Sequence, residues 1–223
     1  AINGPDLFGY ECKKYSNKIS FGDWQASVYL FNIEKKMIDP ASKHAKRMRD
    51  VLKNKKITRD EFIGIFGTPN PKKQNRFSWS GTCFPKYGEN WNHCGQRMYF
   101  DDKGDLVIEY SFINDKRVEK NAFPDYIKKT DKPFPIAFWE KQKLKNHVDN
   151  KFGIRGFFVC KKNKQKVYDK ICFGTTITFS IWLDAFKNKQ IILDSGMYAG
   201  NRRPYSTFRA SKTFWETSVS YTH

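Results

Sequence analysis

Two acidic residues and a lysine near the start of the chain have the types and the spacing that suit hydrolytic chemistry. They are Asp6, Glu11 and Lys13, and residues 7–13 have the character of a β-strand. On a strand, residues i and i+2 share a face. The pattern therefore predicts that Glu11 and Lys13 point the same way, while Cys12 turns back into the core.

A turn around Phe8 and Gly9 can fold Asp6 back beside Glu11, so that two carboxylates and one ammonium group converge. Such a set suits metal-assisted hydrolysis of a phosphodiester. Carboxylate oxygens hold Mg²⁺, which polarises the phosphate and lowers the pKa of bound water. The lysine positions the nucleophile and offsets the developing charge. The alternative is an ordinary strand edge that carries surface charges.

The overall charge indicates a class of substrate. The chain has 223 residues, with 41 lysines and arginines against 23 aspartates and glutamates, which gives a net charge of +18. Both halves of the chain are basic. A positive field of this kind suits a polyanion, of which nucleic acid is the commonest, although a lysine-rich surface can also serve solubility alone. Aromatic residues make up 17% of the chain, enough for a core, and no apolar run reaches the ~18 residues of a membrane span.

A second set of residues suits contact with DNA. Guanidinium groups can bind the O6 and N7 atoms of guanine or the oxygens of a phosphate. The candidates near the end of the chain are Asn201, Arg202, Arg203, Tyr205, Arg209 and Lys212. Lys72, Lys73 and Arg76 are further phosphate-binding candidates in a long Gly-, Pro- and Lys-rich segment. The alternative is an exposed loop that carries a chance pair of arginines.

The elements that must position these residues predict an α/β fold with a mixed central β-sheet flanked by helices. We expect a single domain over residues 1–223, with catalytic strands within 1–34 and recognition elements at about 60–112 and 194–212. Residues 64–92 are predicted to be mostly loop. The predicted strands are 7–13, 26–33, 97–100, 106–112, 153–160 (buried on both faces), 167–173 and 191–194, and the predicted helices are 42–56, 133–148 and 178–187.

The five cysteines favour a reducing, intracellular environment, because their number is odd and a chain of this size needs no disulfides to fold. Cys12 and Cys160 are predicted to be small core residues. Cys83, His93 and Cys94 are three potential zinc ligands, but they lack paired spacing and a fourth member, so packing is the simpler interpretation. Spacings typical of serine hydrolases, phosphate-binding loops and zinc proteases are absent.

The chain resembles the PD-(D/E)xK nuclease superfamily through Pro5-Asp6 followed by Glu11-Cys12-Lys13. Within it, the chain is most similar to the MutH and MvaI/BcnI group of nucleases, and residues 194–209 resemble that group's Gly- and Arg-rich segment before a C-terminal Phe-Arg strand. The resemblance implies a restriction-endonuclease-like fold with a DNA cleft between a catalytic lobe and a recognition lobe that is rich in loops and hairpins. It also implies Mg²⁺ as cofactor, with Asp6 and Glu11 as metal ligands and Lys13 as the catalytic lysine.

One departure from the family concerns the region before Asp6. The family places a helix with a further acidic residue there, whereas five residues precede Asp6 in this sequence. We therefore expect that helix to be missing from this sequence. Either it comes from an upstream segment of a longer enzyme, or a second chain supplies it, or the chain is not competent for catalysis alone.

The expected function is that of a Mg²⁺-dependent type II restriction endonuclease in the bacterial cytoplasm, without membrane attachment. It would cut double-stranded DNA at a short specific site and leave 5′-phosphate and 3′-hydroxyl ends, as the resemblance implies. A MutH-like repair nickase and a non-catalytic, sequence-specific DNA-binding module on the same fold are the alternatives.

Overall fold

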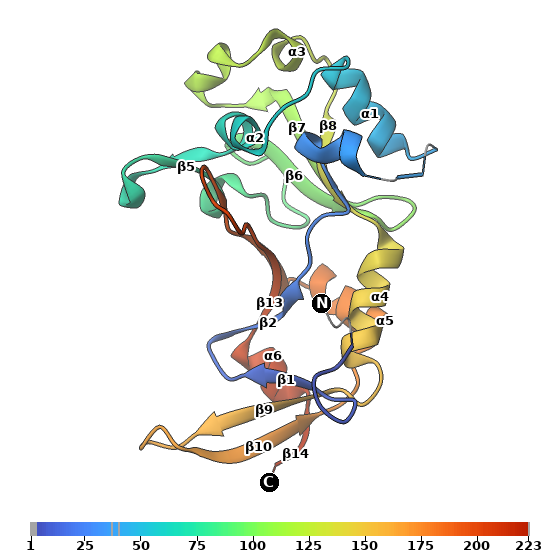
Figure 1. Ribbon diagram of the computed structural model, residues 1–223, viewed down its shortest axis with the longest axis vertical. Coiled ribbons are helices and arrows are strands. Elements are labelled where there is room, and N and C mark those ends of the chain that lie inside the picture. Colours follow the sequence, from blue (N-terminus) through green and yellow to red (C-terminus); the bar gives the residue numbers. More distant parts are fainter. Residues whose placement is uncertain (1–3, 37, 40, 223) are drawn as a thin grey trace. The chain divides into compact units, whose positions relative to one another are not determined.

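The computed structural model describes residues 4–36, 38–39 and 41–222, and it divides the chain into two compact units (Figure 1). The first unit comprises Ala1–Trp24, Gln142–Leu193 and Thr207–His223. The second comprises Gln25–Lys141 and Asp194–Ser206. The chain thus crosses between the units several times, and each unit is assembled from segments distant in sequence.

The first unit is built mainly on two small sheets. One has the order β1-β9-β10-β14, with β1 parallel to β9 and the other pairs antiparallel, so the sheet is mixed. The other has the order β11-β13-β2. The bounds of these elements, and of the helices that accompany them, are β1 (Glu11–Lys14), β2 (Lys18–Asp23), α4 (Lys141–Phe152), β9 (Phe157–Lys162), β10 (Tyr168–Gly174), α5 (Phe179–Lys187), β11 (Ile191–Ser195), β13 (Ser206–Ser211), α6 (Lys212–Thr217) and β14 (Val219–Thr222).

Aromatic packing fixes β2 within this unit. The Phe21 ring is fully buried, and its centroid lies 4.6 Å from that of Trp215 and 5.2 Å from that of Phe152. The indole of Trp215 also donates to the carbonyl oxygen of Ile19 at 3.2 Å. Burial of an aromatic side chain of this size contributes about 1.5–3 kcal/mol to stability. The backbone of β2, including the carbonyl of Phe21, is therefore held in a defined place.

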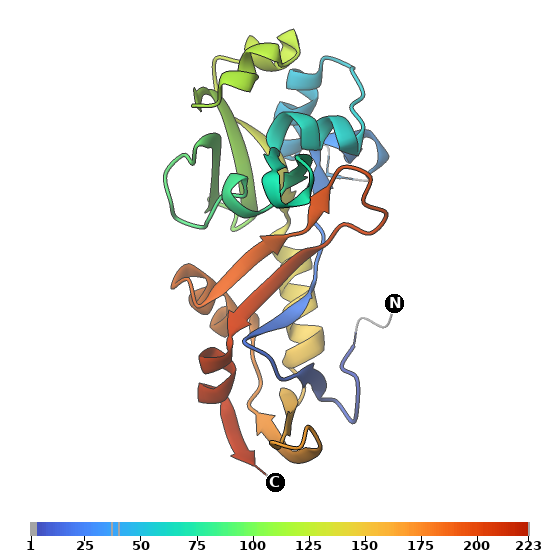
Figure 2. The same cartoon turned by 90° about the vertical axis from the view of Figure 1, so that its left-hand side faces the viewer.

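The second unit has an antiparallel sheet of order β3-β8-β7-β6 and a three-stranded sheet of order β12-β5-β4. Figure 2 shows the long β6–β7 hairpin with the helices beside it. The bounds are β3 (Val28–Tyr29), η1 (Leu30–Lys35), α1 (Lys43–Leu52), α2 (Arg59–Phe66), β4 (Thr68–Asn70), η2 (Pro71–Lys73), β5 (Arg76–Trp79), η3 (Gly81–Cys83), β6 (Cys94–Phe100), β7 (Leu106–Asp115), η4 (Val118–Ala122), α3 (Asp125–Lys128), β8 (Phe134–Trp139) and β12 (Met197–Tyr198).

A buried amide links the elements of the second unit. Gln96 on β6 accepts a hydrogen bond from the Trp79 indole at 2.8 Å and donates to the Phe66 carbonyl at 2.7 Å. The amide is fully buried, and an unpaired polar group at this depth would cost about 1–3 kcal/mol. These bonds tie β5 and the end of α2 to the main sheet, and β5 carries one of the DNA-binding candidates.

The predicted mixed α/β class is confirmed, with the strands distributed over several sheets. The helices at 42–56 and 178–187 and the hairpin around 101–104 are also confirmed, as α1, α5 and β6–β7. Among the described residues, no helix is long and apolar enough to cross a membrane.

Three predicted elements are wrong. Residues 26–33 form only the short β3 and then the 3₁₀ helix η1, and residues 64–92 contain the end of α2 and the β4–β5 hairpin rather than loop alone. The segment that begins at Pro133 is first the strand β8 and only then α4. Pro135 is tolerated in β8 because it faces Glu109 at an irregularity of the β7–β8 ladder, where a lost N–H donor disrupts least.

The strand at 153–160 also differs from its prediction of burial on both faces. β9 begins at Phe157 and alternates: Phe157 and Val159 are buried, whereas Phe158 and Cys160 are partly exposed. The continuous apolar run therefore reflects a half-exposed strand at this position.

Candidate active site and nucleic-acid interface

A tight turn places Asp6 across from Glu11. Leu7 and Tyr10 exchange two backbone hydrogen bonds, of 3.0 and 2.8 Å, around Phe8 and Gly9. Both of these central residues have positive φ, at 47° and 85°, as in a type I′ turn. Glycine adopts such a value at little cost, which explains Gly9 at this point. The predicted return of the chain at residues 8–9 is therefore present in the structure.

Strand β1 begins where this turn ends. The Glu11 N–H donates to the Gly156 carbonyl at 3.0 Å, and the parallel ladder with β9 starts at the pair Glu11–Phe157. Gly156 has φ +91°, and a Cβ there would lie 2.4 Å from the Gly174 carbonyl oxygen. Only glycine fits, so this close backbone approach sets the position of Glu11 along the sheet.

Glu11 is the centre of the candidate active site. The residue is 2% exposed, and its Oε1 accepts hydrogen bonds from the ammonium groups of Lys13, at 2.8 Å, and Lys151, at 2.9 Å. Its Oε2 is buried and has no hydrogen-bond partner among the described residues. A buried carboxylate needs compensating charge, which the two lysines supply. An unpartnered anionic oxygen beside them has the chemistry of a ligand for a hard cation.

Lys13 is held by two acceptors. Its Nζ donates to Glu11 Oε1 and, at 3.2 Å, to the Phe21 carbonyl oxygen. The side chain is 11% exposed. Burial lowers the pKa of Lys13 below its usual value, and the hydrogen bond to Glu11 acts in the opposite direction. An ammonium group has three N–H donors, so one remains for a bound molecule.

Asp6 is exposed, and its Oδ2 accepts the Cys12 N–H at 3.0 Å. Glu11 and Lys13 do share a face, as predicted, but that face is the inward one. Cys12 is consequently exposed rather than buried in the core, because alternate residues of a strand point to opposite sides. Asp6, Glu11 and Lys13 are thus close together in the structure, with Asp6 at the open side.

Lys151 is a site residue that the sequence analysis did not identify. It lies on α4, 140 residues after Glu11 in sequence. The signal was its position: Lys151 follows Leu144 and Val148 at the i+7 and i+3 spacings, on the edge of the buried stripe of the helix. A lysine at such a position needs an anionic partner, which the sequence could not name.

One cluster of potential metal ligands lies in the second unit. His44, Asp101 and Asp105 each offer an atom within 4.8 Å of the others. Asp101 Oδ2 lies 2.8 Å from His44 Nε2, and its Oδ1 accepts the N–H groups of Lys103 and Asp105 at the tip of the β6–β7 hairpin. The cluster therefore serves to close the hairpin and attach it to α1. In the part of the chain that the structure describes, Cys83, His93 and Cys94 form no such group.

The predicted DNA-binding residues fall in different surroundings. Arg202 and Arg203 are exposed on the loop after β12. Asn201 is 8% exposed, and its amide is used within the loop, donating to Gly196 O at 2.8 Å and accepting from Arg203 N at 2.9 Å. Its side chain therefore shapes the loop that carries the two arginines. Tyr205 is half-buried, with its ring against the Cα of Gly196.

The other candidates divide between the units. Lys72 and Lys73 are exposed at the tip of the β4–β5 hairpin, in the second unit. Arg209, half-buried on β13, and Lys212, at the start of α6, belong to the first unit. Lys212 lies over the Tyr15 ring with its Nζ 5.0 Å from the centroid. The C-terminal candidates are thus contributed by both units.

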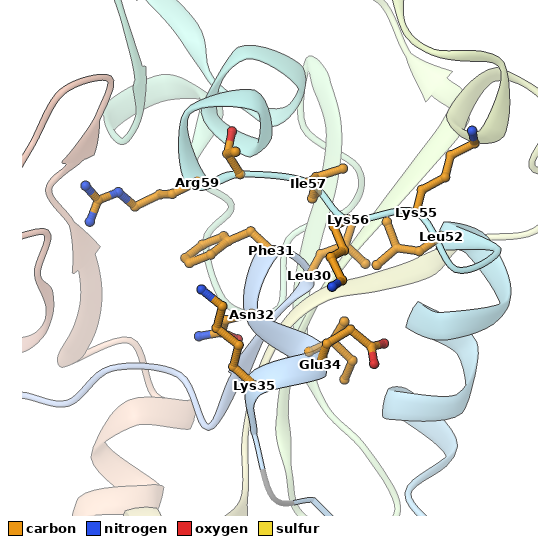
Figure 3. Close-up of a pocket in the computed structure, with 12 residues that line it drawn as sticks. Leu30, Phe31, Asn32, Glu34, Lys35, Leu52, Lys55, Lys56, Ile57 and Arg59 are labelled. Carbon is orange, nitrogen blue, oxygen red and sulfur yellow. The ribbon is translucent and has the colours of Figure 1, made fainter.

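A basic groove lies in the second unit between η1, the end of α1 and the start of α2 (Figure 3). Its volume is about 590 Å³, and its floor is apolar. The cations that line it are Lys35, Lys55, Lys56 and Arg59, against the single acid Glu34. Arg59 also donates to the Asn201 carbonyl oxygen, which ties α2 to the loop that carries Arg202 and Arg203.

Comparison with known proteins agrees with this chemistry. A model of the LlaMI restriction endonuclease family matches residues 2–222. The type II restriction enzyme ScrFI of Lactococcus lactis subsp. cremoris is 34% identical over 238 residues, which cover 100% of this chain and 82% of that protein.

Two solved structures are also similar, with 14% sequence identity each. Restriction endonuclease MvaI in complex with its cognate DNA substrate gives a TM-score of 0.46, and covers 100% of this chain and 81% of its own. MvaI in the absence of DNA gives a TM-score of 0.44, with 98% and 79% covered. Because the family match and the 34% identity both extend over essentially the whole chain, the protein belongs to the LlaMI restriction endonuclease family and is a site-specific DNA endonuclease.

Proposed function

We propose that the protein is a Mg²⁺-dependent type II restriction enzyme that uses Asp6 and Glu11 as metal ligands and Lys13 as the catalytic lysine. The observation that carries this proposal is the unpartnered Oε2 of Glu11, buried beside the ammonium groups of Lys13 and Lys151. Asp6 adds a second carboxylate across the turn, where its Oδ2 accepts the Cys12 N–H. Hard oxygen donors of this kind are the ligands that Mg²⁺ prefers.

The residues of the chain divide the work of hydrolysis. Asp6 and Glu11 would hold the metal, which when bound supplies positive charge that polarises the phosphate and acidifies a water molecule. Lys13 directs its third N–H at the attacking water or a phosphate oxygen, while Glu11 and Phe21 fix its orientation. The water oxygen attacks phosphorus, the bond to the 3′ oxygen breaks, and that oxygen takes up a proton. The products are 5′-phosphate and 3′-hydroxyl ends.

Digestion of phage DNA and of a supercoiled plasmid tests this function. We expect discrete bands that require Mg²⁺ and vanish with a chelator. Nicked circles without linear product would favour a MutH-like nickase, and binding without any cutting would favour a DNA-binding module. The bacterial origin of the ScrFI relative supports action in a bacterial cytoplasm.

Replacement of Lys13 should separate catalysis from binding. In Lys13→Met the cutting rate should fall by about 10²–10³-fold, because an oriented donor to the developing charge is lost. Binding of duplex DNA in Ca²⁺ should change little. Lys145→Met is the matched control, since Lys145 is an exposed lysine of the same helix as Lys151, paired only with Asp149. Normal cutting by Lys13→Met in single-turnover assays would remove Lys13 from the mechanism.

Lys151 calls for a different result. Because its ammonium group competes for the charge of Glu11, we expect Lys151→Met to need less Mg²⁺ for half-maximal cutting, with a smaller loss at saturating Mg²⁺ than Lys13→Met. An unchanged Mg²⁺ requirement would show that Lys151 only supports the fold.

The arginines of the C-terminal segment are proposed to contact DNA, with Arg202 and Arg203 as the exposed pair and Arg209 in support. Replacing a guanine-reading arginine by alanine should cost about 1–3 kcal/mol on the cognate site and relax discrimination at one base pair, whereas a phosphate contact should weaken all sequences equally. The measurement is affinity for cognate and non-cognate duplexes in Ca²⁺. If all three alanine variants bind and cut as the unmodified enzyme does, this segment is not a recognition element.

A further inference from the structure

One arginine of the second unit is held against an aromatic ring from a distant strand. The guanidinium carbon of Arg76, at the start of β5, lies 3.6 Å from the ring centroid of Tyr198 on β12. The two strands are paired through Tyr198–Ser78 and Met197–Trp79, so the backbone fixes the stack. Such an arrangement orders a long, flexible side chain before any ligand arrives.

The polar end of Arg76 has no acceptor in the part of the chain that the structure describes. Its Nε is buried and has no hydrogen-bond partner, and among the described residues no acceptor binds its terminal nitrogens. Other arginines of this unit differ: Arg97 pairs with Glu109 at 2.9 Å, and Arg117 pairs with Asp115 and two backbone carbonyls. These two stabilise the fold. Arg76 is ordered like them, but no acceptor among the described residues binds its guanidinium.

The surroundings of Arg76 form a projecting ribbon. Strands β4 and β5 pair antiparallel from Thr68–Ser78 to Asn70–Arg76, and the tip beyond Arg76 exposes Lys72 and Lys73. Figure 1 shows this hairpin extending away from the sheet of its own unit. The major groove of DNA admits a two-stranded ribbon, and a flat guanidinium presents two parallel donors that match guanine O6 and N7. Lysines in the loop at the tip suit phosphates, whereas a stacked arginine in the last pair before the tip suits the edge of a base.

We propose that Arg76, oriented by Tyr198, reads a guanine in the recognition site and is a specificity-determining residue rather than a phosphate contact. This inference rests on the proposed function, since it assumes that the enzyme binds its site in duplex DNA. According to this inference, positive charge at position 76 is not enough to recognise the guanine. Recognition requires both the planar fork of the guanidinium and the ring beneath it.

The test uses the full-length enzyme with a randomised duplex library, from which cleaved ends give the recognition site, followed by Ca²⁺ binding to cognate and non-cognate duplexes. R76K keeps the charge and loses the fork. We expect its cognate affinity to fall about 5- to 150-fold, with non-cognate affinity unchanged and discrimination lost at one G·C pair. Y198L should show a loss at the same pair, because the ring is gone, whereas Y198F keeps the ring and should keep the discrimination at that pair.

Lys73→Ala is the matched control on the same hairpin, and it should weaken cognate and non-cognate binding equally. If R76K and R76Q weaken cognate and non-cognate binding equally, or leave both affinities unchanged, Arg76 does not read a base and the inference is overturned. Thermal unfolding identifies a variant that is merely destabilised. For such a variant, the ratio of cognate to non-cognate affinity of the folded protein, compared with the same ratio for Y198F, still tests the inference. If the unmodified enzyme binds all duplexes with equal affinity, the result would instead contradict the proposed function itself.

Discussion

The Glu11→Gln enzyme should still bind duplex DNA, but its cutting rate should fall to about one thousandth of the normal rate or below. The change keeps the shape of the side chain and removes one anionic metal ligand. Charge stabilisation by a bound metal contributes several kcal/mol to such a reaction, and each 1.36 kcal/mol corresponds to a tenfold change in rate. The measurements are single-turnover cutting in Mg²⁺ and gel-shift affinity in Ca²⁺. Affinity for DNA should survive or increase, because a negative charge has left the site.

Folding should also survive this change, because the amide oxygen of glutamine can still accept hydrogen bonds from Lys13 and Lys151. Asp6→Asn should behave as Glu11→Gln does. Glu89→Gln is the control: Glu89 is an exposed glutamate of the second unit that pairs only with Lys86, at 3.7 Å. Cutting at the normal rate by Glu11→Gln would contradict the assignment of the active site, whereas loss of cutting in Glu89→Gln would indicate a non-specific effect of charge.

The affinity for DNA should fall by about 10³–10⁵ between 50 and 200 mM salt, if some 6–10 phosphates are neutralised. The net charge of +18 and the exposed lysines of the second unit motivate this expectation. Release of condensed counterions makes the logarithm of the binding constant linear in the logarithm of the salt concentration. The slope should be measured at constant Ca²⁺ with a non-cognate duplex, where base contacts do not contribute.

Variants of the hairpin tip make this result specific. Lys72→Ala and Lys73→Ala should each reduce the magnitude of the slope by about 1, as expected for one lost phosphate contact. Lys145→Ala, in the first unit, is the comparison for loss of a lysine that has an acidic partner. A flat salt dependence in the unmodified enzyme would show that the positive charge serves solubility rather than DNA binding.

Local rules were sufficient for the geometry around Asp6. A turn at Phe8 and Gly9 and the two-residue period of a strand predict the return of the chain and the shared face of Glu11 and Lys13, and the structure has both. They do not predict which face is inward, because that depends on packing against β2 and α4. The predicted orientation of Cys12, into the core, was wrong for this reason.

Long-range pairings account for the remaining differences. Lys151 reaches Glu11 from a helix 140 residues away, and Arg76 meets Tyr198 across two strands that neither segment specifies alone. Pro135 was interpreted as a helix signal, and only the ladder opposite it explains why it lies in β8. In each case the local sequence permits several structures, and a contact with a distant segment selects one.

The pair of ammonium groups on Glu11 has a consequence for the order in which the enzyme acquires its ligands. With its charge already compensated, the carboxylate attracts a divalent cation less strongly than a bare acid would, so in the proposed mechanism the metal binds poorly on its own. A DNA phosphate brings negative charge to the same place and raises the affinity of the site for the cation. By thermodynamic reciprocity, the metal then strengthens the binding of DNA by the same factor. In the proposed mechanism the substrate therefore completes the active site, and hydrolysis does not begin until a phosphodiester is in position.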